Sequence, residues 1–358
     1  MQRREKLMSA AVGAALLAFG AAAQAQQPLQ VELSGQVNRA IMHADDGIDS
    51  DLFNVDNDNS STRFRFTGSQ GITANTKAGV VFEVEYQSSP SNSVSFGGSA
   101  PSPSIDERIM ELFFQSSWGK LSLGQGDGAA NGGVEVDLSG TTVAHYSDVS
   151  AFGGGIAFRT AAGGAGPTVS TVLSNQDFES RYDRLRYDSP NFAGFEVAAS
   201  LGNKDADNRE VTELALRYAG KGSLGELAAT VGYSSQDAAA PGGQDDNTIG
   251  GSVSWLHGSG LNLTAGTTTR ERTPTRDGKF NYFKVGYKWG DHALSADVGQ
   301  AKDQNAAGDK ADVMGIAYVY KVVSWAELYA MARNSSLEQP GIEYEDVQVM
   351  MAGARLKF

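Results

Sequence analysis

The chain has 358 residues, no cysteine and a formal net charge of −13. The acidic balance argues against nucleic acid as a partner, and the lack of cysteine excludes a disulfide framework. The composition, with 43 glycines and 9 prolines, suits many strands joined by turns and is unlike that of a disordered chain.

The first 25 residues have the layout of a targeting segment. A basic head, "MQRREK", precedes the apolar stretch "LMSAAVGAALLAFGAAA", and the small-x-small sequence "AQA" ends at Ala25. This is the three-part pattern of a secretory signal peptide. We predict that residues 1–25 are cleaved and that residues 26–358 form the exported protein. No later segment approaches the roughly 20 uninterrupted apolar residues of a membrane helix.

Almost all of the sequence after this leader repeats with a period of two, the period of a β-strand. In "KAGVVFEVEYQ", the apolar even-numbered residues from Ala78 to Tyr86 share one face. The pattern predicts about sixteen strands. Their expected bounds are residues 29–43, 61–70, 75–87, 105–117, 120–125, 180–189, 193–203, 208–219, 224–235, 246–257, 260–271, 278–289, 292–303, 310–320, 325–334 and 345–358.

The connections between these strands alternate in length. Short links such as "GIT", "WG" and "GD" alternate with longer polar links such as "ADDGIDSDLFNVDNDNS", residues 44–60. Such a meander has its tight turns at one end and its loops at the other, as in transmembrane barrels with an even number of strands. A soluble sandwich has no reason to sort its loops by end.

The two faces of the strands differ in chemistry. The apolar row includes Phe64, Phe66, Leu185, Tyr187, Leu214, Leu216, Phe283, Val285, Leu356 and Phe358, and the opposite row includes Arg63, Arg65, Arg184, Arg186, Glu213, Arg217, Lys284, Lys288, Arg355 and Lys357. Unpaired charges in a dry core cost several kcal/mol each, and a ring of about sixteen strands is too wide for side chains to fill. The charged row is therefore predicted to face internal water, and the apolar row to face lipid.

Aromatic residues gather beside the short turns, as they do where hydrocarbon meets lipid headgroups. They are Trp118, Tyr187, Phe192, Phe195, Tyr218, Trp255, Trp289, Tyr320, Trp325 and Phe358. The alternation in "MMAGARLKF" continues to Phe358. We expect this strand to end at the membrane interface and to pair with the first strand, so that the barrel has no free edge.

The connection at residues 126–179 breaks the rule that loops stay short. Its pieces "GGGIAFRT" and "PTVSTVLS" are candidates for an extra external hairpin. We predict that its first part folds into the lumen and narrows it. There Asp127, Glu135, Asp137 and Asp148 would face a barrel wall of Arg63, Arg65, Arg184 and Arg186. Opposed charge rows across a narrow aqueous gap create a transverse field and decide selectivity.

Several of these pieces resemble one known family. "VELSGQVNRA", "STRFRFTGS", "WGKLSLGQG" before the long loop, "LRYDSPNFAGFEVAASLG" and the final "GARLKF" are similar to segments of the Gram-negative general porins of the proteobacterial outer membrane. The resemblance spans the mature chain. It implies a sixteen-stranded antiparallel transmembrane β-barrel, a homotrimer in outer-membrane lipid and lipopolysaccharide, and a third extracellular loop folded inside as the constriction. It also implies that the barrel-assembly machinery recognises the last strand through Phe358.

The resemblance adds one candidate site residue and leaves one conflict. In the family an arginine near the fourth strand lines the pore, and Arg108 occupies that position. Glu111, however, falls on the opposite parity of the same strand, so the alternation alone does not assign the inner face. The family often has arginine where this chain has Gln125, and histidine where it has Leu356, which leaves the constriction charge open.

Other chemistry has weaker support in the sequence. "GQGDG" is glycine-rich, but no helix follows it to hold a phosphate. The four histidines are scattered and have no metal-ligand spacing. The acidic first connection could hold a structural Ca²⁺ through Asp49, Asp51, Asp56 and Asp58, although their spacing differs from that of an EF-hand. A solvated acidic loop is the simpler interpretation, and no cofactor is expected.

These observations favour a passive outer-membrane diffusion channel for small hydrophilic solutes and ions, without catalysis. A substrate-selective channel that prefers a phosphate or a sugar is the first alternative, and a structural or adhesive barrel is the second. The acidic loop favours cations and the arginine wall favours anions. We expect a net preference for cations.

Overall fold

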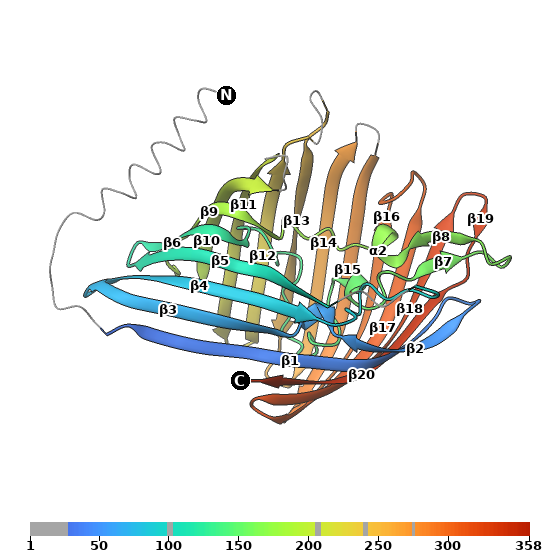
Figure 1. Cartoon of the computed structure of the whole chain (residues 1–358), viewed down its shortest axis with the longest axis horizontal. Coiled ribbons are helices and arrows are strands. Elements are labelled where there is room, and N and C mark those ends of the chain that lie inside the picture. The colour runs from blue at the N-terminus through green and yellow to red at the C-terminus, as the bar shows by residue number, and fades with distance from the viewer. Residues whose placement is uncertain (1–27, 99–102, 205–208, 239–242, 274–275) are drawn as a thin grey trace.

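The computed structural model describes residues 28–98, 103–204, 209–238, 243–273 and 276–358. The predicted signal peptide, residues 1–25, lies outside this part of the chain. Long antiparallel strands form a single ring (Figure 1). The ring closes where β1 (Gln30–Asp45) pairs with β20 (Val347–Lys357), with Gln36 opposite Lys357 and Asp45 opposite Gln348. The fold is a closed sixteen-stranded β-barrel, as predicted.

The remaining wall strands follow one another around the ring in sequence order. They are β3 (Arg63–Thr73), β4 (Thr76–Gln87), β5 (Ser104–Ser116), β6 (Gly119–Asp127), β9 (Arg181–Asp188), β10 (Phe195–Lys204), β11 (Arg209–Gly222), β12 (Gly225–Gln236), β13 (Asp246–Leu256), β14 (Leu261–Thr273), β15 (Arg276–Trp289), β16 (His292–Lys302), β17 (Lys310–Val323) and β18 (Ala326–Gln339). A short strand, β19 (Ile342–Glu343), extends the hairpin after β18. Each predicted strand corresponds to one wall strand.

The segment predicted as the first long polar connection, residues 44–60, contains a further strand, so this prediction was wrong. The chain turns at residues 46–49, and β2 (Ser50–Asp56) returns along β1 with Arg39 opposite Asp56. The 3-10 turn η1 (Asp58–Ser60) then separates β2 from β3. Because β3 pairs with the other half of β1, β2 and β3 together occupy one position in the wall.

Aspartate side chains explain why this acidic segment turns tightly. Asp45 Oδ1 accepts a hydrogen bond from Gly47 N at 2.8 Å, and Asp46 Oδ1 accepts one from Asp49 N at 2.8 Å. Aspartate stabilises turns in this way, by bonding backbone N–H groups two or three residues ahead. The acidic composition therefore forms a hairpin here, where a solvated loop was expected.

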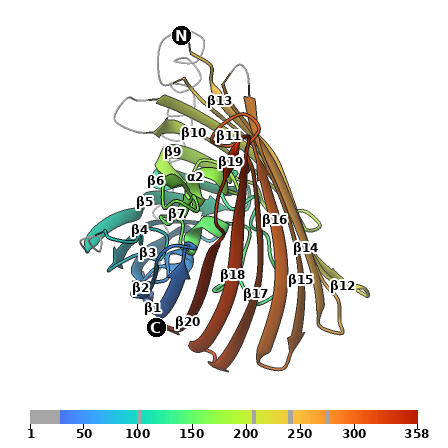
Figure 2. The same ribbon diagram turned by 90° about the vertical axis from the view of Figure 1, so that its right-hand side faces the viewer.

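Most of the tight turns lie at one end of the barrel, and the longest connections lie at the other. Tight turns at residues 117–118, 223–224, 290–291 and 324–325 lie at one end, and the connections at 88–103, 128–180, 303–309 and 340–346 lie at the other. Figure 2 shows the hairpins from β15 to β16 and from β17 to β18 at its lower end. This arrangement confirms the alternation inferred from the sequence.

The apolar row faces outward. Phe64, Leu214 and Leu356 are each about half exposed, and Phe358 is 66% exposed. At the short-turn end the aromatic rings form contacts with one another: the His292 ring stacks on Tyr320 at 4.7 Å and on Trp289 at 5.4 Å between centroids. In the described residues, no helix is long and apolar enough to cross a membrane.

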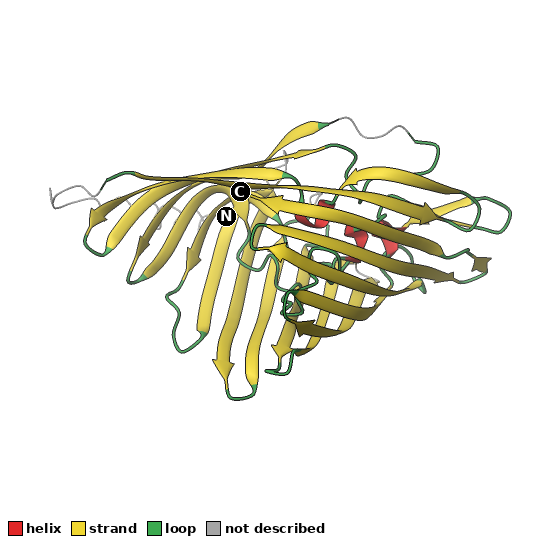
Figure 3. Cartoon of the chain, turned by 90° about the horizontal axis from the view of Figure 1, so that it is seen from below, coloured by secondary structure: helices red, strands yellow, loops and turns green. Residues whose placement is uncertain are grey.

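The long connection between β6 and β9, residues 128–180, is called the inner loop here. It contains η2 (Val149–Ala151), the hairpin of β7 (Ala157–Arg159) and β8 (Ala165–Thr168), and the single-turn helix α2 (Val169–Val172). Figure 2 shows α2 and β7 between the blue and the red parts of the wall, and Figure 3 shows the helices inside the ring of strands. The extra hairpin is present, but half of "PTVSTVLS", Val169–Val172, forms α2 instead of a strand.

An apolar core lies inside the barrel, between the inner loop and one half of the wall. It joins loop residues Val149, Phe152, Ile156, Phe158, Val172 and Leu173 to wall residues Met42, Phe280, Tyr282, Val313, Met331, Val347, Val349 and Met351. The prediction that the inner row faces water throughout was therefore wrong for this half of the wall. The loop covers the inner face of β15–β18 and β20, and apolar side chains there are removed from water.

A test of barrel closure follows from Gly35. A Cβ at this position would lie 2.5 Å from Phe358 Cζ and 2.7 Å from the carbonyl oxygen of Arg63. We expect Gly35→Ala to destabilise the barrel by about 1–3 kcal/mol, because the backbone cannot yield at the closing seam. The measurement is the temperature at which the folded form is lost on heat-modifiable gel electrophoresis. Gly222→Ala is the control, since nothing lies within 4 Å of its added Cβ; equal midpoints for the two variants would contradict the expectation.

Candidate functional site

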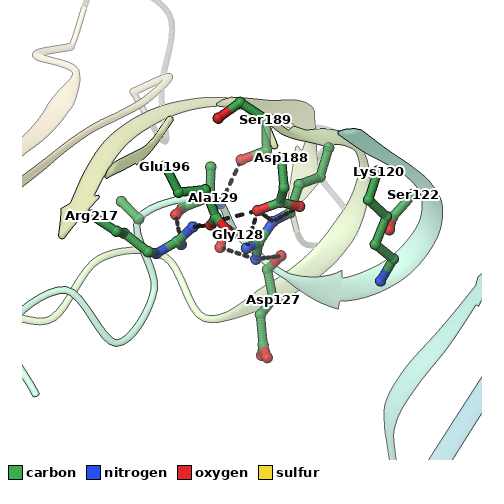
Figure 4. A network of polar contacts seen from close by, with 12 residues as sticks. Lys120, Ser122, Asp127, Gly128, Ala129, Asp188, Ser189, Glu196 and Arg217 are labelled. Atoms are coloured by element: carbon green, nitrogen blue, oxygen red, sulfur yellow. Dashed lines mark hydrogen bonds and ion pairs between the residues drawn. The ribbon is translucent and has the colours of Figure 1, made fainter. Parts of the chain in front are cut away.

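Three arginines of the wall hold the start of the inner loop. Arg184 Nε donates to the carbonyl oxygen of Asp127 at 2.9 Å, Arg186 Nη1 donates to that of Gly128 at 2.9 Å, and Arg217 donates to that of Ala129. Asp188 and Glu196 complete the network around Arg217 (Figure 4). The loop is therefore turned inward by guanidinium groups that bind its backbone.

Both ends of the inner loop meet at one carboxylate. Glu213 Oε2 accepts a hydrogen bond from Ala130 N at 3.2 Å, and Glu213 Oε1 accepts one from Glu179 N at 2.9 Å. The Glu213 side chain is 1% exposed. A buried carboxylate needs such donors, because its desolvation is otherwise unfavourable. Glu213 thus ties the entry of the loop to its exit.

The first half of the loop continues along the inner wall. Val136 N donates to Ser252 Oγ at 3.0 Å and Leu138 N donates to Ser254 Oγ at 2.9 Å. Between them, Lys284 Nζ lies 2.6 Å from Asp137 Oδ2, with side chains 0% and 2% exposed. Asp137 was predicted to line an aqueous gap, but the structure places it in a buried ion pair behind the loop.

A second buried cluster holds the middle of the loop. Asp297 Oδ2 lies 3.0 Å from Arg333 Nη2 and accepts a hydrogen bond from Tyr282 Oη at 2.7 Å, and Asp297 Oδ1 lies 3.1 Å from His145 Nε2. Burial, with Arg333 and Lys284 nearby, lowers the pKa of His145 well below its usual range. The imidazole is therefore neutral at pH 7, and Arg333 forms the ion pair that balances the charge of Asp297.

The opposite wall, on β3–β5, carries a cluster of charged side chains in which Arg65 and Arg63 are the most exposed. Here they are called the arginine face: Arg63, Arg65 and Arg108, with Glu83 and Glu85 between them. Arg65 Nη2 lies 2.7 Å from Glu83, and Arg108 lies 2.8 Å from Glu83 and 2.5 Å from Glu85. The Arg65 side chain is 44% exposed, which makes it the most accessible of the three.

A β-bulge resolves the parity conflict on β5. Glu83 pairs with Ile109 and Val84 pairs with Glu107, so that Arg108 is the extra residue. A bulge shifts the alternation by one residue. Both Arg108 and Glu111 therefore point inward, Arg108 to Glu83 and Glu111 to Arg184 at 2.5 Å.

Of the predicted wall arginines, Arg184 is almost fully buried. Its side chain is 3% exposed and contacts Glu111 and the backbone carbonyl oxygens of Gly124 and Asp127 in β6. Arg186 is partly exposed at a polar cavity of about 700 Å³ on the short-turn side. The other charged residues that line this cavity are Arg65, Glu111, Lys120, Asp127, Arg184, Asp188 and Glu196.

Four partly exposed acids form what is called the carboxylate face: Asp58 from η1, and Glu135, Asp148 and Asp177 from the inner loop. Glu135 accepts a hydrogen bond from Asn175 at 2.9 Å, and Asp177 accepts from the backbone N of Gly132 and of Val134. Asp58 interacts electrostatically with both Asp148 and Arg108. The two faces therefore approach each other near Asp58.

Crowding of these acids changes their protonation. Burial raises the pKa of Asp177 to about 7, and the charge of Asp148 acts in the same direction. Burial together with the charges of Asp177 and Asp148 raises the pKa of Glu135 well above its usual range. The carboxylate face thus gains negative charge as the pH rises through neutrality.

The four acids considered for a metal ion have separate partners. Asp49 lies near Arg159, Asp51 accepts from Leu52 N, and Asp56 accepts from Thr62 N. Asp58 accepts from Gln87 Nε2 at 3.0 Å. Among the described residues, no group of three or more acidic or histidine side chains could hold a metal ion.

Comparisons with known proteins agree with this architecture. The family model for Gram-negative porins matches residues 10–339. A sequence search of curated proteins finds no match. The anion-selective porin from Comamonas acidovorans has a similar structure, with a TM-score of 0.67 and 19% identity over 92% of this chain and 100% of that one.

Two further solved structures share the fold. In OmpF of Salmonella typhi, complexed with daunomycin, the TM-score is 0.64 at 13% identity, over 92% of this chain and 97% of that one. For the trimer form of in-vitro folded OmpT, an outer membrane protein of Vibrio cholerae, the TM-score is 0.61 at 16% identity, over 93% of this chain and 100% of that one.

The buried ion pair between loop and wall gives a test of how the loop is held. Lys284→Met leaves Asp137 unpaired in a dry site, which typically costs about 3–5 kcal/mol. We expect a lower thermal midpoint and faster proteolysis within the inner loop. The double variant Lys284→Met, Asp137→Leu should recover most of the midpoint. Lys221→Met, which breaks an exposed pair with Glu226, is the control and should leave both readouts unchanged; a similar loss in this control would contradict the role of burial.

Proposed function

We propose, from the premise that this chain belongs to the Gram-negative porin family, that solutes cross it between the carboxylate face and the arginine face. The protein is an outer-membrane porin of a Gram-negative bacterium, and its barrel forms a channel. The path, the kinds of solute that use it and the ion preference are the parts that we propose. The proposal includes that the chain catalyses no reaction.

The partly exposed ions inside the barrel carry this proposal. The inner loop covers β15–β18 and β20 with an apolar core, whereas Arg65 on the facing wall keeps a 44% exposed side chain. Charged groups stay accessible inside a barrel only where water reaches them. The water-filled path therefore runs along β3–β6, on the side that the loop leaves open.

The two faces act together on a passing solute. Acids on one side and guanidinium groups on the other produce a transverse field across the narrow part of the lumen. A hydrophilic or dipolar solute can replace its bound water by polar contacts with both faces. An apolar solute makes no such contacts. Passive diffusion of small hydrophilic solutes follows from this arrangement.

The proposed ion preference is for cations. Arg63, Arg65 and Arg108 share their face with Glu83 and Glu85, so three positive charges minus two negative ones leave one positive charge. The carboxylate face has four acids and exceeds this charge when they are ionised. The porin from Comamonas acidovorans is described as anion-selective, so a preference for cations would separate the two proteins.

The assembly that we propose is a homotrimer in outer-membrane lipid and lipopolysaccharide. A trimer form is known for OmpT of Vibrio cholerae, which shares the fold. We also propose that the barrel-assembly machinery recognises the strand that ends with Phe358, whose ring is 66% exposed. Mass measurement of the detergent-solubilised protein tests the trimer, and a monomer mass would contradict it.

The first functional prediction concerns ion selectivity. In a planar bilayer with a salt gradient, the reversal potential should indicate cation preference. The variant Asp148→Asn should shift it toward anions, and Arg65→Gln should shift it further toward cations, because each change removes charge beside the path. Glu226→Gln, near the start of β12 and beside a short turn, is the control. Absence of stepwise conductance in the wild type would reject the channel path, and unchanged reversal potentials would reject the proposed lining.

The second functional prediction concerns pH. The pKa of Asp177 is raised to about 7, so this acid is largely protonated at pH 5 and largely ionised at pH 8, and Glu135, whose pKa is also raised, keeps its proton to a higher pH than an ordinary glutamate. Cation preference should therefore be weaker at pH 5 than at pH 8. Asp177→Asn should reduce the change between the two pH values. The same permeability ratio at both pH values would show that these acids do not act on the permeating ions.

A further inference from the structure

Three lysines form a cationic row near the long-connection end of the wall. The strands β15, β16 and β17 are neighbours in the ring (Figure 2). Lys279 of β15 lies directly opposite Lys302 of β16, and Lys302 lies directly opposite Lys310 of β17. These three residues are called the lysine row. Like charges that face each other across antiparallel strands destabilise the pairing, so an anion bound beside them is favourable.

The lysine row is on the outside of the barrel. On β15, Phe283 and Trp289 have the same parity as Lys279, and their side chains are 46% and 42% exposed. Phe280 and Lys284 have the opposite parity and are fully buried inside the barrel. Because side chains alternate between the two faces of a strand, the lysines project away from the lumen and take no part in lining the channel.

The height of the lysine row matches the edge of the apolar band. Lys279 and Trp289 share the outer face of β15, ten residues apart, and Trp289 belongs to the aromatic cluster at the short-turn end. At a rise of about 3.3 Å per residue and a tilt of about 40°, this spacing spans about 25 Å, the height of the apolar band in such barrels. The lysine row therefore lies where the headgroups of the outer leaflet begin.

The charges next to the row leave two lysines available. Lys310 Nζ lies 2.8 Å from Asp312 Oδ2 and 3.0 Å from Glu338 Oε1. Lys279 and Lys302 are exposed, and neither has an ion-pair partner in the part of the chain that the structure describes. Two unpaired ammonium groups thus stand side by side at the level of the headgroups.

Acids bound the row on its aqueous side. Two residues beyond Lys279 on the same face, Asp277 lies opposite Glu271 of β14, and both are exposed. Their charges repel an anion placed further from the membrane. The favoured position of an anion is therefore at the lysines, next to the hydrocarbon.

A hollow of about 720 Å³ lies beside the lysine row. It is called the outer hollow, and its lining from β12 to β15 includes Val231, Ile249, Val253, Ala265, Thr267 and Asn281. The first three of these are between 42% and 60% exposed, whereas Thr230 and Thr268, of the opposite parity, are buried. The outer hollow therefore opens toward lipid. It reaches the lysine row, since Thr269 in its lining lies opposite Lys279.

Asn281 joins the outer hollow to the lysine row. It is two residues from Lys279 on the same face, and its Oδ1 accepts a hydrogen bond from Thr267 Oγ1 at 2.9 Å. Its Nδ2 has no hydrogen-bond partner among the described residues, and the side chain is exposed. A polar donor at the edge of hydrocarbon is unfavourable unless it is bonded. An ester or hydroxyl oxygen of a lipid is an acceptor that suits this position.

We propose that the lysine row and the outer hollow together bind one lipid of the outer leaflet that bears phosphate on its headgroup. The phosphate oxygens accept hydrogen bonds from Lys279 Nζ and Lys302 Nζ, an ester oxygen accepts from Asn281 Nδ2, and an acyl chain occupies the outer hollow. A free phosphate ion fits this surface less well, because it leaves the apolar hollow uncovered. The inference deepens the proposed assembly in outer-membrane lipid and lipopolysaccharide, and it rests on that proposal.

The experiment measures the first lipid bound to the purified full chain. Native mass spectrometry in detergent is used to titrate the protein with diphosphoryl lipid A, and a phosphate-free lipid, digalactosyl diacylglycerol, forms the second arm. The wild type should bind lipid A more tightly than the neutral lipid. The double variant Lys279→Gln, Lys302→Gln should weaken lipid A binding at least about tenfold, because each lysine beside an anionic headgroup contributes a factor of about five.

Two matched controls separate the site from general effects of charge and size. Lys77→Gln, Lys321→Gln removes two exposed lysines at the short-turn end and should leave lipid A binding unchanged. Ala265→Phe fills the outer hollow and should weaken the binding of lipid A. Ala199→Phe makes the same change at an exposed outward position of β10 and should have no effect.

Several results would overturn the proposal. One is lipid A binding that is unchanged in both Lys279→Gln, Lys302→Gln and Ala265→Phe, and another is an equal loss in the controls. Inorganic phosphate that displaces lipid A at equal concentration would point to a free-anion site. A changed oligomer mass with unchanged lipid binding would show that the lysine row faces a second copy of the chain.

Conductance in planar bilayers distinguishes this inference from the channel function. The lysine variants should conduct as the wild type does, since the row lies outside the lumen. If the wild type conducts but has no preference for lipid A, the lipid site fails alone. If it binds lipid A at the lysine row but conducts no ions, the channel function fails and the lipid site stands.

Discussion

The structure depends on the pairing between β1 and β20. A backbone N–H or C=O that faces hydrocarbon without a partner costs several kcal/mol, so a sheet in a membrane must close on itself. Here the seam runs from Gln36 opposite Lys357 to Asp45 opposite Gln348, and Gly35 and Phe358 exchange backbone hydrogen bonds of 2.9 and 3.0 Å beyond it. The ring of Phe358 fits only because Gly35 has no side chain. Everything inside the barrel presupposes this closure.

The inner loop turns a wide ring into a narrow channel by two different means. On one side it buries apolar side chains such as Phe152 and Phe158 against the wall, which provides stabilisation without fixing direction. Elsewhere it uses directional contacts: Arg186, Glu213 and Lys284 each bind particular atoms of the loop. The apolar core keeps the loop inside, and the polar contacts decide where its acids lie. Function thus depends on groups that are not themselves in the path.

The alternation of residues predicted the strands, but it failed where local geometry changed the period. At Arg108 an extra residue in β5 reverses the parity, and no sequence signal marks that bulge. The acidic composition around Asp45 and Asp46 predicted a solvated loop. In the structure, their carboxylates accept hydrogen bonds from backbone N–H groups and stabilise the tight turn that precedes β2. In both cases the outcome depends on hydrogen bonds to atoms outside the periodic pattern. Asp137 and Arg184 show a related limit, because their charge predicted contact with water. Instead, Asp137 forms a buried ion pair with Lys284, and Arg184 forms one with Glu111.

The sequence by itself determined that the chain is a barrel with an apolar exterior, because a period of two and the chemistry of each face are local properties of every strand. It also predicted that the long connection matters, since its length and acidity are visible without coordinates. Only the tertiary structure decided which charges meet. Asp58 and Asp177 lie more than a hundred residues apart, and the wall residues that hold the loop come from seven or more strands. Such contacts depend on the path of the inner loop across the lumen, which is set by packing between segments that are distant in the sequence.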